Sequence, residues 1–369
     1  MKKLLSAVLA VLTAAVPLLF ASCGSNTAIE SPRAEYTREY AGTTLNVFNW
    51  GEYISDGSEG SLNVNKAFEA LTGIHVNYST YDSNESMYAK LSSGAVSYDV
   101  VIPSDYMIER MIREDMILPL DMSKLTNYDL IDDQYKGLFY DPENQYSVPY
   151  NVGLVGLIYN TTMVEGTPDS WSIMWDETYK DNVLIFDNPR DAFGIAQFLI
   201  GVDINSTDKA DWDAAAEKLK ELSKIWQGRV MDQVFAKMEG ANAAIAPYYA
   251  GDFLVMKENN PDLAFVYPKE GTNIFVDACC IPKNASSYEA ALLYINFLME
   301  PEVALANAEY ICYASPNTSV SGNPDYEYYG EEILYPDPET LPPTEYFHDI
   351  DPEIRSYYEK LWDSVLIGE

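Results

Sequence analysis

Short apolar runs alternate with amphipathic segments from residue 44 onward, and this alternation limits the chain to a small set of folds. Residues 44–50, 74–81 and 98–103 have the length and the β-branched and aromatic content of strands. Between them, residues 62–71 and 82–91 carry apolar side chains at helical spacing. A strand–helix–strand–helix–strand order requires crossover connections, so it predicts a parallel sheet covered by helices.

Local signals mark the ends of these two helices. Gly73 follows the first one and predicts its end, because glycine adopts the left-handed conformation at a helix C-terminus without strain. Asp82, with Glu85 three residues later, predicts a capping box that opens the second helix, which runs through Leu91.

The same alternation repeats after residue 150. Further strands are predicted at residues 154–159, 182–187, 243–247, 263–267 and 273–281, and further helices at residues 192–200, 212–226, 288–299 and 303–309. We expect the long apolar run 154–159 to cross between two lobes. Two lobes are expected because roughly 345 of the 369 residues remain after the N-terminal signal, and a single core usually stops growing below that size.

The N-terminus has the pattern of a secretory signal peptide over residues 1–22, with two lysines, an apolar run and small residues before Cys23. Cys23 stands where a bacterial lipoprotein signal has its acylated cysteine, and residues 23–42 are expected to form a polar tether. Phe20 replaces the aliphatic residue that is usual three positions earlier, so simple secretion is the open alternative. Either way, we expect the protein in the periplasm or on the outer face of the cytoplasmic membrane.

Composition excludes several classes of protein. The net charge of -34 disfavours binding to nucleic acid and favours binding to cations. The same charge is also explained by an ordinary acidic surface that keeps the protein in solution. With 47% hydrophobic and 22% charged residues, the chain is not of the disordered class. Cys279, Cys280 and Cys312 remain besides Cys23, an odd number that excludes a disulfide framework, and the first two are predicted to be buried thiols.

Acidic and aromatic residues recur at the carboxyl ends of the predicted strands, where ligands bind in open α/β sheets. They are Trp50, Glu52 and Tyr53; Ser104 and Tyr106; Asp191; Tyr249 and Asp252; and Phe275 and Asp277. Each residue by itself is explained more simply by packing or by a helix cap. Together they predict a site for an organic amine, because aromatic faces attract cations and carboxylates bind ammonium groups.

Four segments carry a resemblance to a known family. Residues 49–53, 78–91, 98–104 and 310–317 resemble the bacterial spermidine/putrescine periplasmic binding proteins. The resemblance implies an α/β, two-lobed periplasmic-binding-protein-like fold of type 2, in which each lobe is a sheet flanked by helices. It also implies a polyamine in the cleft between the lobes and delivery to the permease subunits of an ABC importer. We expect a monomer with residues 43–150 and 276–321 in lobe 1 and residues 151–275 and 322–369 in lobe 2.

The resemblance also assigns the candidate residues to lobes. Five residues would line the first lobe: Trp50, Glu52, Tyr53, Ser104 and Tyr106. The second lobe and the crossover would supply Asp191, Tyr249, Asp252, Phe275 and Asp277, and Tyr313 would close the site. The chain departs from the family pattern at Gly51, Asn188, Tyr249, Phe275 and Phe347, so the resemblance leaves open whether spermidine or putrescine is preferred.

Other functions fit the sequence less well. Carboxylates among aromatic residues also describe a glycosidase cleft, but no motif supplies a general acid, and His75 and His348 accompany no nucleophile signature. We therefore expect no enzymatic activity, no cofactor and no metal; in particular, no segment has the spacing of an EF-hand calcium loop. A surface polyamine sensor with the same fold is the second alternative, because fold does not dictate function.

Overall fold

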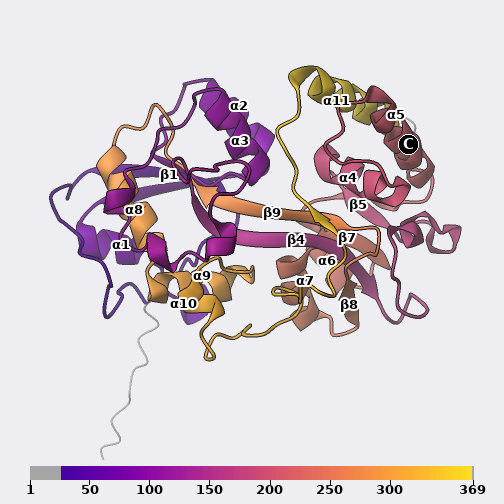
Figure 1. The fold of residues 1–369 in the computed structure, drawn as a ribbon. Coiled ribbons are helices and arrows are strands. Elements are labelled where there is room, and N and C mark those ends of the chain that lie inside the picture. The colour runs from indigo at the N-terminus through magenta and orange to yellow at the C-terminus, as the bar shows by residue number, and fades with distance from the viewer. Residues whose placement is uncertain (1–25, 368–369) are drawn as a thin grey trace, which may run out of the picture.

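Residues 26–367 are described by a computed structural model, in which two lobes are joined by long strands (Figure 1). The predicted signal peptide and Cys23 lie outside the described residues. Lobe 1 is the half built around the N-terminal sheet, and lobe 2 is the half that carries the C-terminal helix.

Lobe 1 contains the predicted parallel sheet, with strand order β2-β1-β3. Its strands are β1 (Thr44–Trp50), β2 (His75–Tyr81) and β3 (Val100–Val101). The helices of this lobe are α1 (Val64–Thr72), α2 (Asn84–Ser92), α3 (Asp105–Arg113), α8 (Tyr288–Leu298), α9 (Pro301–Ile311) and α10 (Thr318–Ser321). The parallel sheet that the alternation of strands and helices predicted is therefore confirmed.

The two helix-end predictions had different outcomes. Gly73 does end α1, with a φ of 76° and its N–H bonded to the carbonyl of Glu69. The capping box of α2 is formed by Ser83 and Ser86, so the prediction of Asp82 with Glu85 was wrong by one residue. The serine hydroxyls close the reciprocal pair, Ser86 N to Ser83 Oγ at 3.1 Å and Ser83 N to Ser86 Oγ at 3.3 Å.

Two long strands cross between the lobes. They are β4 (Val148–Asn160) and β9 (Thr272–Cys279), which pair in antiparallel fashion, and all 13 residues of β4 are buried. In lobe 2, β4 also pairs in antiparallel fashion with β7 (Ile245–Tyr249) and β8 (Leu263–Val266), while β10 (Thr344–Glu345) lies parallel to β9. Figure 1 shows β4 and β9 side by side through the middle of the molecule.

The rest of lobe 2 surrounds this sheet. Its remaining strands, β5 (Leu184–Phe186) and β6 (Gly228–Val230), form a parallel pair. Its helices are α4 (Pro189–Ile200), α5 (Lys209–Leu222), α6 (Gln233–Glu239), α7 (Ala250–Asn259) and α11 (Pro352–Leu366). Short 3-10 helices occupy connections at Ser58–Gly60, Met122–Lys124, Tyr128–Leu130, Asp133–Tyr135, Trp171–Trp175 and Glu177–Tyr179.

The hydrophobic core links the lobes through the crossing strands. Alternate residues of β1 face opposite sides of the lobe 1 sheet, so Val47 packs with α1, α8 and α9, whereas Phe48 packs with α2 and α3. The hydrophobic cluster that contains Phe48 continues through Leu157 of β4 into lobe 2. The crossing strands therefore join the lobes covalently and also carry a continuous hydrophobic core from one lobe to the other.

The N-terminal segment, residues 26–42, lies on lobe 1. Its contacts centre on Glu300 at the start of α9, which is 1% exposed. The Glu300 carboxylate accepts hydrogen bonds from the backbone of Arg33 (2.7 Å) and Ala34 (2.9 Å) and from the hydroxyl of Tyr36 (2.7 Å). Arg33 also forms a bidentate ion pair with Asp129, at 2.6 Å for each bond. The segment expected to be a tether thus makes specific tertiary contacts.

Cys279, Cys280 and Cys312 are buried free thiols, which confirms the prediction for the first two. Burial raises the pKa of the Cys279 thiol far above its usual value, so the residue packs as a small apolar group. Between residues 26 and 367, no helix is both long and apolar enough to cross a bilayer.

Candidate ligand-binding site

Three aspartates reach the region between the lobes from three different elements. Asp191 is in the first turn of α4, directly after β5, and Asp252 is in the first turn of α7, directly after β7. Asp277 lies on the crossing strand β9, opposite Asn151 of β4. Two of the three therefore stand at strand ends, where the sequence predicted them, and the third stands on the connection between the lobes.

Asp277 is held from the lobe 1 side by two hydroxyl groups. The Tyr53 hydroxyl donates to Asp277 Oδ2 and the Ser104 hydroxyl donates to Oδ1, each at 2.6 Å. The side chain is 3% exposed, and burial raises the pKa of its carboxyl from 3.8 to about 6, although the two hydroxyls oppose that shift. Each oxygen has lone pairs left, so the carboxylate can accept further hydrogen bonds from a cation.

The other two aspartates have the same kind of partner. The Tyr313 hydroxyl donates to Asp252 Oδ2 at 2.9 Å, and the Tyr249 hydroxyl donates to Asp191 Oδ2 at 3.2 Å. Burial raises the pKa of both carboxyl groups to about 7, while the tyrosine hydrogen bonds act in the opposite direction. Tyr313 follows α9 of lobe 1 and Asp252 belongs to lobe 2, so their bond joins the two lobes.

Aromatic rings form a continuous wall between these carboxylates. The centroid distances are 5.5 Å for Tyr53 and Tyr313, 6.3 Å for Tyr313 and Phe275, and 5.4 Å for Phe275 and Tyr249. Gly153 of β4 makes room for the wall, since a Cβ there would lie 2.2 Å from the Phe275 ring. The wall presents apolar ring faces next to carboxylate oxygens, an environment that suits a methylene chain ending in ammonium groups.

Gly251 allows the two lobes to approach each other at this wall. A Cβ on Gly251, in the first turn of α7, would lie 2.5 Å from the Tyr313 ring and 2.5 Å from the Cys312 carbonyl oxygen. Cys312 itself has a φ of 61°, a left-handed conformation that ends α9 one residue before Tyr313. Backbone shape on both sides thus brings Tyr313 to Asp252.

The remaining predicted residues lie around this cluster. Trp50 donates its indole N–H to the carbonyl of Ile102 at 2.9 Å. Tyr106 donates its hydroxyl to Glu85 at 3.0 Å, and its ring lies 6.4 Å from that of Phe347. Glu52 is exposed in a left-handed conformation, with a φ of 50°. These three contribute to the surroundings of the carboxylates rather than bonding to them directly.

Asn84 was missed by the sequence reasoning. Its side-chain N–H groups donate to the Ser104 hydroxyl and to the Tyr106 hydroxyl, each at 3.1 Å, and the residue is 5% exposed. It therefore positions two predicted residues at once from the first turn of α2. The available signal was weak, because an asparagine at a helix start is most simply read as a cap.

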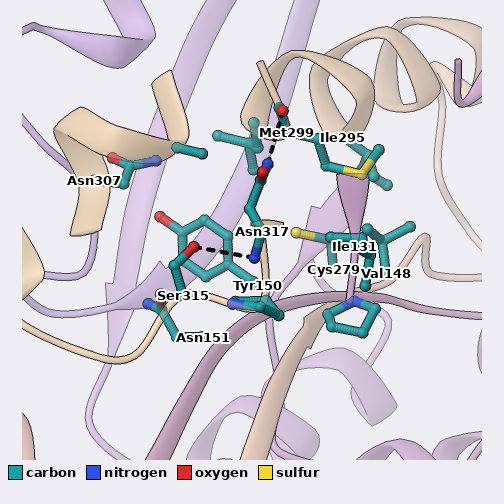
Figure 2. Close-up of a pocket in the computed structure, with 14 residues that line it drawn as sticks. Ile131, Val148, Tyr150, Asn151, Cys279, Ile295, Met299, Asn307, Ser315 and Asn317 are labelled. Carbon is teal, nitrogen blue, oxygen red and sulfur yellow. Dashed lines mark hydrogen bonds between the residues drawn. The ribbon is translucent and has the colours of Figure 1, made fainter. Parts of the chain in front are cut away.

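A separate small cavity lies on the lobe 1 side of β4 (Figure 2). It is lined by residues of β4, α8 and α9 and by the segment 315–317, and none of the predicted site residues contributes to it. The side-chain nitrogens of Asn151 and Asn307 at this cavity have no hydrogen-bond partner among the described residues. Its volume of about 20 Å³ suits a single water molecule and excludes a polyamine.

Comparison with known proteins gives a consistent result. The profile of the family described as bacterial extracellular solute-binding protein matches residues 97–330. The spermidine/putrescine-binding periplasmic protein of Salmonella typhimurium is 36% identical over 325 residues, which cover 86% of this chain and 91% of that protein. A putrescine-binding periplasmic protein of Escherichia coli is 27% identical over 346 residues, which cover 88% of this chain and 92% of that protein.

Solved structures agree with the sequence comparisons. A protein from Listeria monocytogenes assigned to spermidine/putrescine ABC transport superimposes with a TM-score of 0.83 at 35% identity, covering 89% of this chain and all of that one (100%). A lipoprotein of Treponema pallidum superimposes with a TM-score of 0.76 at 25% identity, covering 87% of this chain and 99% of that one. The expected type 2 periplasmic-binding-protein fold is thereby confirmed.

Proposed function

Because the chain belongs to the family of bacterial extracellular solute-binding proteins, we propose that it captures a small polyamine between its lobes and delivers it to an ABC importer. The observation that carries this proposal is the group of three buried aspartates, Asp191, Asp252 and Asp277, set along one aromatic wall. The curated relatives that bind spermidine and putrescine support the same ligand class.

The proposed ligand is at least divalent. Three carboxylates offer more negative charge than one ammonium group can neutralise, and a buried carboxylate without a partner is costly. Asp277 would bind one ammonium, oriented by Tyr53 and Ser104, and the lobe 2 aspartates would bind the other end of the ligand. The rings of Phe275 and Tyr249 would cover the methylene chain between them.

The arrangement suits binding rather than catalysis. Each of the three carboxylates accepts a hydrogen bond from a protein hydroxyl, and each can still bind a cation. The curated relatives are named as polyamine-binding proteins, and the Listeria monocytogenes structure is assigned to ABC transport. We therefore assign no catalytic role to these residues.

Lobe closure would be part of capture. The proposed contacts come from both lobes, and a ligand can favour the closed state only through contacts that the open state lacks. The strands β4 and β9 connect the lobes, so we place the hinge near Pro149–Gly153 and near Thr272–Asp277. X-ray scattering should give a smaller radius of gyration with saturating polyamine; an unchanged profile with proven binding would contradict closure.

Lipid anchoring at Cys23 is a further part of the proposal. It is supported by the lipoprotein-like signal sequence and by the Treponema pallidum relative, which is a lipoprotein. The contacts of residues 26–38 with lobe 1 would keep that lobe close to the membrane. In fractionated cells, the wild type should then be found with the membrane and the Cys23→Ala variant in the soluble fraction. Recovery of both the wild type and the variant in the soluble fraction would indicate simple secretion.

Calorimetric titration of the purified mature protein tests the ligand class. We expect putrescine or spermidine to bind with a dissociation constant of about 1 μM, which corresponds to about -8 kcal/mol. Butylamine, which keeps the four-carbon chain but carries one ammonium, should bind much more weakly. Equal binding of the monoamine would contradict the proposed site, and no binding of any polyamine would contradict the function. Light scattering during size-exclusion chromatography would test the proposed monomer.

A further inference from the structure

A short segment of lobe 2 between β10 and α11 contacts lobe 1 through helix α3. This segment, residues 346–351, is called the strap. In Figure 1 it is the yellow chain that runs from the central strands toward α11. Asn205 of lobe 2 fixes its backbone, donating to the carbonyl of Tyr346 and accepting from the N–H of His348, each at 2.8 Å. Arg190 supports Asn205 through a 2.7 Å hydrogen bond. The strap therefore belongs to lobe 2.

Helix α3 of lobe 1 contacts the strap through two charged side chains. Glu109 accepts a hydrogen bond from the backbone N–H of Asp349 at 2.7 Å. Arg113 binds the Asp349 carboxylate, with Nε and Nη2 at 2.7 and 2.6 Å from Oδ2. The other carboxylate oxygen accepts from Arg355 of α11 at 2.6 Å. Asp349 thus has one arginine partner from each lobe.

This ion pair differs from an ordinary surface pair because its carboxylate is enclosed. The Asp349 side chain is 6% exposed, Arg355 is 16% exposed and Arg113 is 48% exposed. A buried carboxylate is stabilised by each cation that contacts it, and solvent screens this electrostatic attraction less than it does on an open surface. If the lobes separated, Asp349 would keep Arg355 and lose Arg113.

Helix α3 also connects the strap to the candidate site. Its N-cap is Ser104, which binds Asp277, and its first turn carries Tyr106. The ring of Phe347, from the strap, lies 6.4 Å from that of Tyr106 and is 5% exposed. One helix therefore carries a site residue at its start and a contact with lobe 2 at its end.

From these contacts, and resting on the proposed function, we infer that Arg113 and Asp349 are positioning residues that hold the lobes together and so set ligand affinity from outside the binding site. The apparent affinity for a ligand that needs the closed form is scaled by the fraction of protein in that form. An interlobe pair that exists only in the closed form raises this fraction. Loss of the pair should therefore weaken binding even though neither residue contacts the ligand.

The sign of the effect separates this role from a simple effect of charge. Arg113 is a cation on a protein proposed to bind cations, so its removal makes the protein more attractive to a polyamine through the general field. The positioning role predicts the opposite outcome, which is weaker binding. Arg110 provides a matched control, since it lies on the same helix and its partners, Glu114 and the ring of Tyr88, both belong to lobe 1.

The experiment compares putrescine and spermidine binding by calorimetry to the wild type, Arg113→Gln and Arg110→Gln. We expect Arg113→Gln to raise the dissociation constant about three- to tenfold, and Arg110→Gln to leave it unchanged or slightly lower. Arg113→Lys, which keeps a cation, should recover part of the loss. In an Asp349→Asn background, Arg113→Gln should have no further effect. Thermal unfolding of each variant verifies folding.

Equal or tighter binding by Arg113→Gln, as for Arg110→Gln, would overturn the inference. An undiminished effect of Arg113→Gln in the Asp349→Asn background would also overturn it, because the loss would then have another origin. If the wild type bound neither polyamine, the proposed function itself would fail. The two failures are thus distinguished by the wild-type titration.

Discussion

Replacing Asp277 with asparagine should separate stability from binding. Asp277 is 3% exposed, and burial raises the pKa of its carboxyl from 3.8 to about 6. That rise corresponds to about 3 kcal/mol in favour of the protonated, neutral form. Because the folded protein holds this proton more tightly than the unfolded chain, the free energy of unfolding falls as pH rises from 4 to 6, and the whole loss is present at pH 7. Asparagine has a similar shape without that cost.

The substitution also removes one hydrogen bond. The carboxylate accepts from both Tyr53 and Ser104, whereas the amide of asparagine has one acceptor oxygen and an NH2 group that cannot accept. A lost hydrogen bond of this kind costs about 1 kcal/mol. The ligand-free variant should therefore be as stable as the wild type at pH 7, or more stable by about 2 kcal/mol.

Binding should change in the opposite direction. An ammonium group placed against a neutral amide loses a buried charge pair, which costs about 2 to 5 kcal/mol, or roughly 30-fold to several thousand-fold in affinity. Calorimetry would measure this loss, and thermal unfolding with and without polyamine would measure stability and the ligand-induced shift. Asp262→Asn is the control, since Asp262 is exposed and contributes only to the general field.

Two results would refute this reasoning. Binding of polyamines by Asp277→Asn within about threefold of the wild type, in a cooperatively folded protein, would mean that the ammonium does not lie at β9. A large loss of stability in the ligand-free variant would mean that the carboxylate is a structural requirement rather than a binding group held at a cost.

The remaining predictions concern protonation and packing. Polyamine affinity should fall as pH decreases from 8 to 5, because the three aspartates have pKa values raised to about 6 or 7 and must lose their protons to pair with ammonium; calorimetry in buffers of different ionisation enthalpy should detect proton release, and a flat pH profile would contradict it. Glu300→Gln should cost about 1 to 3 kcal/mol of unfolding free energy and expose Arg33 to trypsin. Glu302→Gln should do neither, because the exposed Glu302 carboxylate accepts a hydrogen bond from the backbone of Glu30 that the glutamine oxygen can also accept. Gly153→Ala should cost about 1 to 3 kcal/mol and weaken binding by displacing Phe275, whereas Gly228→Ala, with open space around it, should change neither.

Periodicity predicted the position of most elements because it reflects local burial. The parallel sheet of lobe 1 and the end of α1 at Gly73 follow from patterns within a few residues. The start of α2 was less certain, because adjacent residues offer two capping frames and only the fold selects Ser83. The strand β4 begins six residues before the predicted start at Leu154, since a strand buried on both faces has no alternation to mark its end.

Long-range pairing could not be predicted from local sequence. The antiparallel arrangement of β4 with β7, β8 and β9 depends on how the chain returns to the crossing strand. The N-terminal segment is polar and reads as a tether, yet it docks because a buried glutamate more than 250 residues later in the chain, Glu300, accepts its hydrogen bonds. A hydrogen-bond partner so distant leaves no signal in the segment itself.

In the candidate site, too, the features set by local sequence were predicted and those set by long-range contacts were not. Strand-end positions pointed to Asp191, Asp252 and Tyr249, because ligands gather at such ends in α/β sheets. Other features depend on segments that are distant in the sequence. These are the hydrogen bonds from Tyr249 and Tyr313 to the lobe 2 aspartates, and the contacts by which Asn84 orients Ser104 and Tyr106.

The central claim is that a polyamine lies between the lobes with its ammonium groups on the buried aspartates. A crystal structure of the mature protein grown with putrescine or spermidine tests it most directly. We expect one ligand nitrogen within roughly 3.2 Å of the Asp277 carboxylate and another within that distance of Asp191 or Asp252, with the methylene chain along Phe275 and Tyr249. A polyamine bound elsewhere on the protein, or one that leaves Asp277 bonded only to Tyr53 and Ser104, would contradict the account.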